Sequence, residues 1–200
     1  MRDFTPYIAG VVAADGHLYS REVRIGTSER TFLRFLRSNL ERLGYDPRVE
    51  EGRRVWIVRI YSTQLRRVLT NSYAIPIGKK AQKIIFPVWL EKRKLRHYVA
   101  GFFDGDGSIS VYNSGRKGDW GPYKTIRITF TSKSRRFLAG LRTYLKSVGL
   151  TPTSVKKEKE VYRLKMYSLE NLKLFRQLFT IRHPVKLSRM SSVLQGELVP

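Results

Sequence analysis

The stretch Tyr7-Ile-Ala-Gly-Val-Val-Ala-Ala-Asp-Gly16 decides the fold, because the chain contains it twice. Its second version is Tyr98-Val-Ala-Gly-Phe-Phe-Asp-Gly-Asp-Gly107, displaced by 91 residues. The residues that follow also recur: Phe32, Leu33, Leu36, Leu40 and Gly44 return 105 residues later as Phe137, Leu138, Leu141, Leu145 and Gly149. Self-similarity over such a period indicates two copies of one structural unit. The change of offset predicts a 14-residue insertion in the second copy, placed in the polar, glycine-rich segment Asn113–Tyr123.

Hydrophobic periodicity predicts helix, strand, strand, helix, strand, strand and helix in each copy. Short helices are expected at Pro6–Ala14 and Leu95–Gly105, each ended by a glycine, Gly16 or Gly107, that caps the helix with positive φ. Period-two alternation predicts half-buried strands, and apolar residues at helical spacing predict amphipathic helices over the sheets. The strands are expected at Val23–Thr27, Val55–Ser62, Thr125–Ser132 and Val161–Ser168, and the helices at Glu29–Leu43, Gln64–Tyr73, Ser134–Val148 and Leu169–Phe179.

The charge of the chain points to a polyanionic partner. The 200 residues carry a formal net charge of +23, of which residues 1–95 contribute +10 and residues 96–200 contribute +13. Such an excess favours nucleic acid first, an anionic membrane surface second and an acidic protein third. Hydrophobic residues make up 42% of the chain, which is enough for a packed core. Both copies are therefore expected to fold and to face the same partner.

The absence of cysteine narrows the chemistry. Disulfides, a thiolate nucleophile and a Cys-based zinc site are excluded, and the three histidines lie too far apart for a local zinc motif. Any metal should be a hard cation bound by oxygen. The apolar runs are too short to span a bilayer and the N-terminus is a poor signal peptide, so an intracellular location is expected. The low content of thermolabile residues suggests a thermophilic archaeal host, although the base composition of the gene could produce the same bias. The expected location is the cytoplasm of a prokaryote or an organelle.

Asp15 and Asp106 are the candidate catalytic residues. Each ends a predicted helix, where the helix dipole disfavours a carboxylate. Small residues along both helices would let the two backbones approach closely, and a pseudo-twofold axis would then bring the carboxylates together around a divalent cation. An isolated Asp-Gly after an apolar run is more often a plain turn. Two copies at the same place in a repeated unit of a basic chain favour the metal site.

The two motifs resemble the signature of the LAGLIDADG homing endonucleases, in their single-chain form with two motif copies. The resemblance covers nearly the whole chain and implies an α+β fold of two αββαββα repeats, 1–92 and 93–200, in a pseudo-twofold arrangement. The motif helices would pair at the interface, and two antiparallel sheets would form a saddle over duplex DNA. The family's metal-binding acid is the eighth motif residue, here Asp15 and Asp106. The sixth residue is Asp104 in the second copy but Ala13 in the first, which leaves no assigned role for Asp104.

The same resemblance suggests the remaining site residues. It implies Mg²⁺ at two or more sites between the motif helices, with the backbone carbonyls of Ala14 and Gly105 as further ligands. Basic residues that assist phosphodiester hydrolysis are expected at the end of the second strand and after the third helix; ordinary phosphate contact is the alternative role. The candidates are Lys133, Lys80 and Lys186. Because the first copy has Ser28 where the second has Lys133, the two DNA strands are expected to be cut at unequal rates.

Strand alternation predicts which side chains meet DNA. Residues opposite the buried ones on each strand face outward, and Arg, Lys and Thr on a sheet can lie in the major groove. The predicted DNA contacts are Arg24, Arg59, Arg127, Thr129, Arg163 and Lys165. The loop Ser114–Lys124, with Trp120, is expected either to reach flanking DNA or to form a disordered hairpin.

These observations predict a monomeric, Mg²⁺-dependent endonuclease that recognises a long, asymmetric duplex site and makes a staggered double-strand cut in intron homing. Two alternatives stay open. The first is a maturase that binds its intron RNA and assists splicing. The second is a DNA-binding regulator that has lost cleavage, against which the two retained carboxylates argue.

Overall fold

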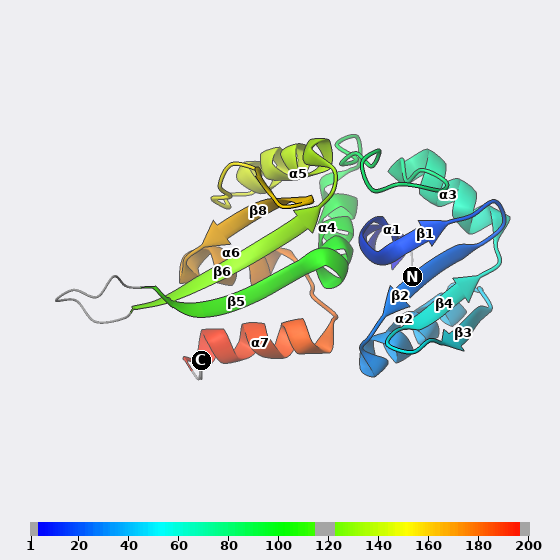
Figure 1. The fold of residues 1–200 in the computed structure, drawn as a ribbon, viewed down its shortest axis with the longest axis horizontal. Helices are drawn as coiled ribbons and strands as arrows, with labels where there is room; N and C mark the ends of the chain where they lie inside the picture. The colour runs from blue at the N-terminus through cyan, green and yellow to red at the C-terminus, as the bar shows by residue number, and fades with distance from the viewer. Residues whose placement is uncertain (1–3, 115–122, 197–200) are drawn as a thin grey trace.

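The computed structural model describes residues 4–114 and 123–196, and these form two halves of the same design (Figure 1). The elements of the first half are α1 (Phe4–Asp15), β1 (Gly16–Leu18), β2 (Val23–Thr27), α2 (Arg30–Arg42), β3 (Pro47–Glu51), β4 (Trp56–Ile60) and α3 (Thr63–Tyr73). Those of the second half are α4 (Lys92–Asp106), β5 (Gly107–Ser114), β6 (Tyr123–Ser132), α5 (Arg135–Ser147), β7 (Lys156–Glu158), β8 (Val161–Tyr167) and α6 (Leu169–Leu178), followed by α7 (Pro184–Gln195). The predicted α+β class and the αββαββα order of each copy are confirmed.

Each half contains one four-stranded antiparallel sheet with the same topology. The strand orders are β1-β2-β4-β3 and β5-β6-β8-β7, so the second strand of each half pairs with the first and the fourth. In the first sheet Ile25 lies opposite Val58 and Arg24 lies opposite Arg59. The two aliphatic residues are fully buried under the helices, whereas the arginines lie on the other face. Period-two alternation therefore separates the core from an outer basic face, as predicted.

The helices α2 and α5 cover the inner faces of the sheets, and side-chain caps fix where they begin. Glu29 accepts a hydrogen bond from the backbone N–H of Thr31 at the start of α2. Ser134 accepts one from the N–H of Phe137 at the start of α5 and donates a 2.7 Å bond to the carbonyl of Ile84 in the segment that joins the halves. Each cap satisfies a backbone donor that the helix itself leaves unpaired. Ser134 additionally fixes the connecting segment against the second half.

The glycines that follow the motif helices do not cap them with positive φ, and that prediction was wrong. Gly107 has φ of −86° and begins a strand, as Gly16 does. Glycine is required there because the chain turns back closely on the helix. An added Cβ would lie 2.6 Å from Val12 Cα at Gly16 and 2.4 Å from the carbonyl oxygen of Phe103 at Gly107.

The second half differs from the first in two regions. Strands β5 and β6 extend well beyond β1 and β2, in the segment where the insertion was predicted. The tip of that segment, with Trp120 and most of the loop expected to reach DNA, lies outside the described residues. Helix α7, which sequence periodicity did not reveal, runs along β5, and Arg189 in it donates to the carbonyl of Ile109.

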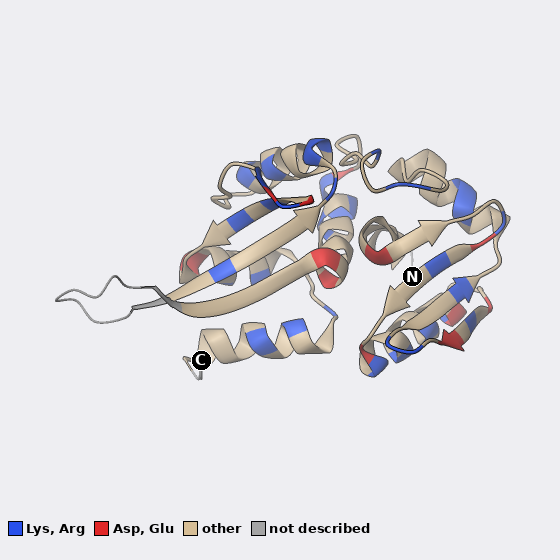
Figure 2. Cartoon of the chain, viewed as in Figure 1, with Lys and Arg blue, Asp and Glu red and all other residues tan. Residues whose placement is uncertain are grey.

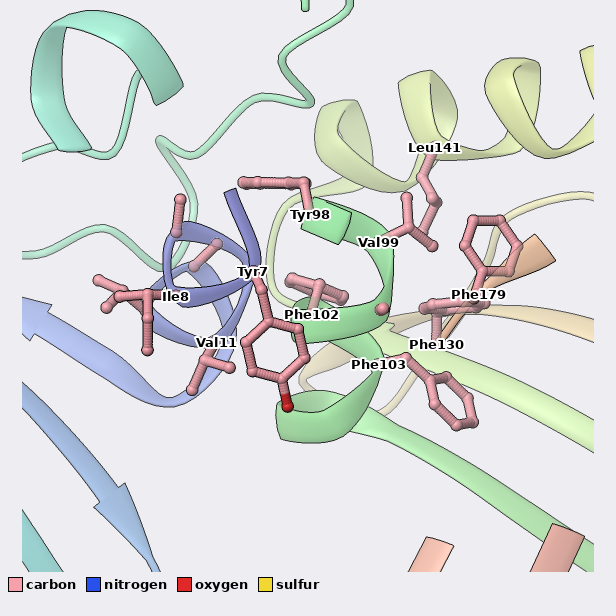
Figure 3. Packing of buried hydrophobic residues seen from close by; sticks show 14 of the residues in the cluster. Tyr7, Ile8, Val11, Tyr98, Val99, Phe102, Phe103, Phe130, Leu141 and Phe179 are labelled. Atoms are coloured by element: carbon pink, nitrogen blue, oxygen red, sulfur yellow. The ribbon is translucent and has the colours of Figure 1, made fainter. Parts of the chain in front are cut away.

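The two motif helices form the centre of the molecule, with one sheet on either side (Figures 1 and 3). The middle of α1, from Pro6 to Ala13, and the C-terminal part of α4, from Tyr98 to Asp104, are buried. The aromatic residues Tyr98, Phe102 and Phe103 of α4 belong to this core. Within the described residues, none of the helices is both long and apolar enough to cross a lipid bilayer.

Candidate active site and nucleic-acid interface

Helices α1 and α4 pack backbone against backbone, as the small residues in the motifs predicted. A Cβ added to Gly10 would lie 2.0 Å from the carbonyl oxygen of Tyr98, and one added to Gly101 would lie 2.0 Å from that of Tyr7. The contacts of the two glycines correspond, so a pseudo-twofold axis relates the helices and places their C-terminal ends side by side.

The paired ends bring Asp15 and Asp106 together. The Asp15 carboxylate lies against Gly105 of α4, where an added Cβ would be 3.1 Å from Asp15 Oδ2. Asp106 is the next residue and is half-buried, whereas Asp15 lies at the exposed rim. Desolvation raises the pKa of Asp15, and desolvation together with the charge of Asp15 raises the pKa of Asp106 to about 6. Two carboxylates that repel each other in this way are a suitable environment for a cation.

Each helix end is bound by a lysine from its own half of the chain. Lys80 Nζ donates to the carbonyl oxygens of Val12, Ala13 and Ala14 at the end of α1. Lys186 Nζ donates to those of Phe103, Asp104 and Gly105 at the end of α4, at 2.8, 2.7 and 2.6 Å. An ammonium group has three hydrogens, so all its donors are used, and its charge complements the negative end of the helix dipole. Desolvation lowers the pKa of both lysines to about 8, while the neighbouring aspartates oppose the shift.

A cavity of about 240 Å³ opens beside Asp106 and brings several of the predicted residues together. Its lining combines Asp106 and Lys133 from the second half with Lys80 and Ala14 from the first. Lys133 is exposed, directly after the end of β6, and the ends of α1 and β6 form the cavity walls. The candidate site at Asp106 is therefore composed of both halves of the chain.

The residues at this site fit a hard divalent cation in part. Carboxylate oxygens are the ligands that Mg²⁺ prefers, and the repulsion within the Asp15–Asp106 pair is relieved by a positive ion. The carbonyls of Ala14 and Gly105, which were predicted as further ligands, each accept a hydrogen bond from a lysine, Lys80 or Lys186, through one of their two lone pairs. Across residues 4–114 and 123–196, no group of three or more His, Cys, Asp or Glu side chains could hold a metal ion. Ligands of a cation here beyond the two carboxylates would therefore come from backbone carbonyls, water or phosphate.

Asp104, for which the sequence suggested no role, connects three elements. It is 2% exposed, and its Oδ2 accepts a 2.5 Å hydrogen bond from the hydroxyl of Tyr7 and a 2.7 Å bond from the N–H of Arg182. In the first half the motif position of Asp104 is occupied by Ala13, which cannot accept a hydrogen bond. With Lys80 aligned on Lys186, an offset of 106, Arg182 corresponds to Pro76, which has no N–H to donate. The first copy thus lacks both the acceptor carboxylate and the backbone donor. Replacement of the motif aspartate by Ala13 therefore leaves no unpaired group at positions 13 and 76.

The predicted DNA contacts lie on the outer faces of the sheets, but they do not point freely into solvent. Arg24 and Arg59 form ion pairs with Glu22, and Arg163 and Lys165 both bind Glu158. Arg127 lies over the ring of Tyr112, 4.9 Å from its centroid. Thr129 faces the same way but is only 5% exposed, so it has little surface to offer DNA in this structure. Sequence reasoning missed Glu22 and Glu158. Glu22 directly precedes β2 and binds Arg24 from outside the strand.

Figure 2 shows that Lys and Arg are spread over both sheets and over the outer helices, while acidic residues are few. Both halves are basic, in agreement with the nearly even division of the net charge. The two outer sheet faces lie on either side of the paired helices, so they could contact one extended polyanion together.

Comparisons with known proteins agree with this geometry. The family model described as the LAGLIDADG-like domain matches residues 5–72 and again residues 93–179. The homing endonuclease I-ApeI of Aeropyrum pernix is 26% identical over 204 aligned residues, which cover 94% of this chain and 86% of that protein.

Solved structures show the same fold. The meganuclease I-SmaMI bound to uncleavable DNA superposes with a TM-score of 0.73 at 12% identity, over 98% of this chain and 91% of the other. I-DmoI in complex with DNA and Mn superposes with a TM-score of 0.63 at 14% identity, over 90% of this chain and 98% of the other.

Proposed function

The chain belongs to the LAGLIDADG-like family, and from that premise we propose that it is a site-specific endonuclease that cuts both strands of a long, asymmetric duplex DNA target. The observation that carries the proposal is the pairing of Asp15 and Asp106 at adjacent helix ends between two basic sheets. The related homing endonuclease and the meganucleases solved with DNA support it. Two carboxylates match two scissile phosphates, one on each strand, and a staggered cut follows from their separate positions.

We propose Mg²⁺ as the metal, since Asp15 and Asp106 supply hard oxygen ligands and the similar I-DmoI was solved with Mn. A bound divalent cation would activate water and neutralise charge on the phosphate. Asp15 and Asp106 hold the cation, and the basic sheets bring the phosphates to it. Lys133, exposed in the cavity beside Asp106, is placed to stabilise charge that develops on the phosphate.

The roles of Lys80 and Lys186 differ from that of Lys133. Their ammonium hydrogens are engaged by the last carbonyls of α1 and α4, immediately before the two aspartates. We therefore assign them to positioning: they hold the helix ends, and with them the carboxylates, while their charges offset part of the repulsion between Asp15 and Asp106.

The test starts from a target found by selection. Duplexes bound by the protein are enriched from a randomised library, cloned into a supercoiled plasmid and incubated with the protein and either Mg²⁺ or EDTA. Wild type should linearise the plasmid only with Mg²⁺. Asp15→Asn and Asp106→Asn should each slow cleavage by two orders of magnitude or more, while Asp46→Asn, in an exposed loop, should cut like wild type.

Two results would overturn the proposal. Wild type that binds the selected duplex but leaves it intact would be a DNA-binding regulator, and aspartate variants that cut as well as wild type would place the chemistry elsewhere.

A further inference from the structure

Three arginines stand in one row across the outer face of the first sheet. Arg24 of β2 lies directly opposite Arg59 of β4, which lies opposite Arg48 of β3 on its other side. Like charges directly opposite each other on neighbouring strands destabilise a sheet. Carboxylates must therefore lie within the row or beside it, and the structure places Glu22 and Glu50 there.

Glu22 is the more enclosed of the two carboxylates. It is 8% exposed although it lies on the outer face, and its two oxygens bind the Arg24 guanidinium at both Nε and Nη2, at 2.5 and 3.0 Å. Its Oε1 is also 3.5 Å from Nε of Arg59. The hydrogen bond from Arg24 lowers the pKa of Glu22, so it is ionised at neutral pH. One carboxylate thus fixes one arginine through two bonds and contacts a second.

Arg24 is held in one plane by two different contacts. Glu22 takes the Nε–Nη2 edge of the guanidinium, and the Tyr19 ring lies beneath it, 4.3 Å from ring centroid to Arg24 Cζ. The Nη1–Nη2 edge remains, and it has the fork geometry that binds O6 and N7 of guanine in the major groove. Arg24 is therefore oriented before any DNA arrives.

In the second sheet, Arg127 has an aromatic neighbour like that of Arg24 but no carboxylate partner of the same kind. Arg127 lies over Tyr112, as Arg24 lies over Tyr19, but its Nε donates to the neutral hydroxyl of Ser110 at 3.2 Å. Its guanidinium therefore has an aromatic support and donates its hydrogen bond to a side chain that carries no charge. The bidentate carboxylate contact distinguishes Arg24.

We propose that Glu22 is a specificity-determining positioning residue, which orients Arg24 for guanine and at the same time lowers the affinity for unrelated DNA. Orientation in advance reduces the side-chain entropy lost when Arg24 binds its base. A carboxylate on the DNA-facing surface also repels phosphates, and this weakens the sequence-independent contacts that dominate non-specific binding. Both effects raise the ratio of specific to non-specific affinity. The inference rests on the proposed duplex-DNA binding.

The test compares base preference with overall affinity in the metal-free protein. Binding to a randomised duplex library at fixed salt, followed by sequencing, gives the preference at each position, and a scrambled duplex gives the non-specific affinity. Arg24→Ala identifies the position at which Arg24 selects guanine. At that position Glu22→Gln should lower the guanine preference about fivefold or more, while non-specific binding tightens severalfold.

Two matched variants separate geometry from charge. Glu50→Gln removes the same charge from the same face, but Glu50 forms its ion pair with Arg59 and makes no bidentate contact with Arg24, so the variant should tighten non-specific binding and keep the Arg24-dependent preference. Glu22→Asp keeps the charge but shortens the reach, so it should lower the preference without tightening non-specific binding. Glu22→Asp also tests the role of Glu22 if the Glu22→Gln variant folds poorly.

The outcomes distinguish failure of the inference about Glu22 from failure of the proposed DNA-binding function. The inference is overturned if Glu22→Gln or Glu22→Asp keeps the full guanine preference, or if Arg24→Ala changes no position. If wild type binds no duplex DNA, the proposed function fails and the inference falls with it.

Discussion

The hydroxyl of Tyr7 donates a 2.5 Å hydrogen bond to Asp104, 97 residues away, and so joins α1 to the last turn of α4. Tyr98, the corresponding residue of the second copy, is fully buried, but its hydroxyl has no hydrogen-bond partner within the described part of the chain. Two tyrosines at the same place in the repeat therefore have different energetic roles.

Replacing these tyrosines by phenylalanine tests that difference. Tyr7→Phe leaves the buried Asp104 without one donor and should lower the free energy of unfolding by roughly 1–3 kcal/mol. Tyr98→Phe removes a hydroxyl that has no partner, so its effect should be within about 0.5 kcal/mol of zero or slightly stabilising. Urea denaturation measures both, and equal losses in the two variants would contradict the assignment.

Helix pairing predicts a large effect of a single added methyl group. Gly101→Ala would place Cβ 2.0 Å from a backbone oxygen of the other motif helix, so the helices must move apart. We expect a loss of about 2–4 kcal/mol in unfolding free energy. Gly26→Ala is the control, because no atom lies within 4 Å of the added Cβ, and it should change stability by less than about 1 kcal/mol.

The same movement should reduce cleavage, because it separates Asp15 from Asp106. Gly101→Ala protein that is still folded at low temperature should therefore cut more slowly than Gly26→Ala protein under the same conditions. Equal stability of the two alanine variants would show that the helix interface tolerates a shift.

Asp106 should make the metal-free protein less stable at neutral pH than its asparagine variant. Its pKa is about 6 in the folded protein and about 4 in an unfolded chain, so the folded state binds more protons between these values. Stability from this group therefore falls as pH rises from about 4 to 6. Asp106→Asn removes the penalty and should be more stable than wild type by roughly 1–2 kcal/mol at pH 7.5.

Chemical denaturation in EDTA at pH 4 and at pH 7.5 checks this prediction, with Asp46→Asn as the control. The advantage of Asp106→Asn should appear at pH 7.5 and shrink toward pH 4. An advantage of the same size at both pH values would point to a cause other than ionisation.

Lys133 should make the two strands unequal substrates. The cavity beside Asp106 contains this exposed ammonium, whereas the first half has Ser28 at the corresponding position. Lys133→Ser should slow the cut of one strand by roughly tenfold or more, so that nicked plasmid accumulates. End-labelled strands identify the slow cut, and Ser28→Lys should accelerate the other strand. Uniform slowing of both cuts would indicate a role for Lys133 in binding alone.

The repeat made most of the fold predictable, because hydrophobic periodicity is a local property that both copies share. Strands β2, β4, β6 and β8 and the amphipathic helices α2 and α5 follow from it, and the pairing of α1 with α4 follows from the small residues in the repeated motif. The φ of Gly107 did not, since the sequence cannot distinguish a glycine needed for close approach from one needed for positive φ. Helix α7 was missed because only two of its residues, Met190 and Val193, are buried, in contacts with both α6 and β5.

Some features of the candidate site could likewise be predicted from the sequence and others could not. Asp15 and Asp106 could be found from the sequence, because their importance lies in the motif itself. The carbonyl partners of Lys80 and Lys186, and the hydrogen bonds of Asp104, depend on contacts across about 70 to 100 residues that no local pattern encodes. Glu22 was missed because it directly precedes β2 and so stands outside the alternating pattern of that strand.

The paired absence of an acceptor at Ala13 and a donor at Pro76, where the second half has Asp104 and Arg182, shows what covalent linkage of the halves permits. In a two-fold homodimer every substitution appears twice, so the contact surface stays symmetric and a palindromic site suits it best. With both halves on one chain, each side of the interface can change independently: Asp104 binds the Tyr7 hydroxyl, whereas Ala13 offers no acceptor to the buried hydroxyl of Tyr98. The two halves therefore keep one fold but are free to differ residue by residue along the interface that they share.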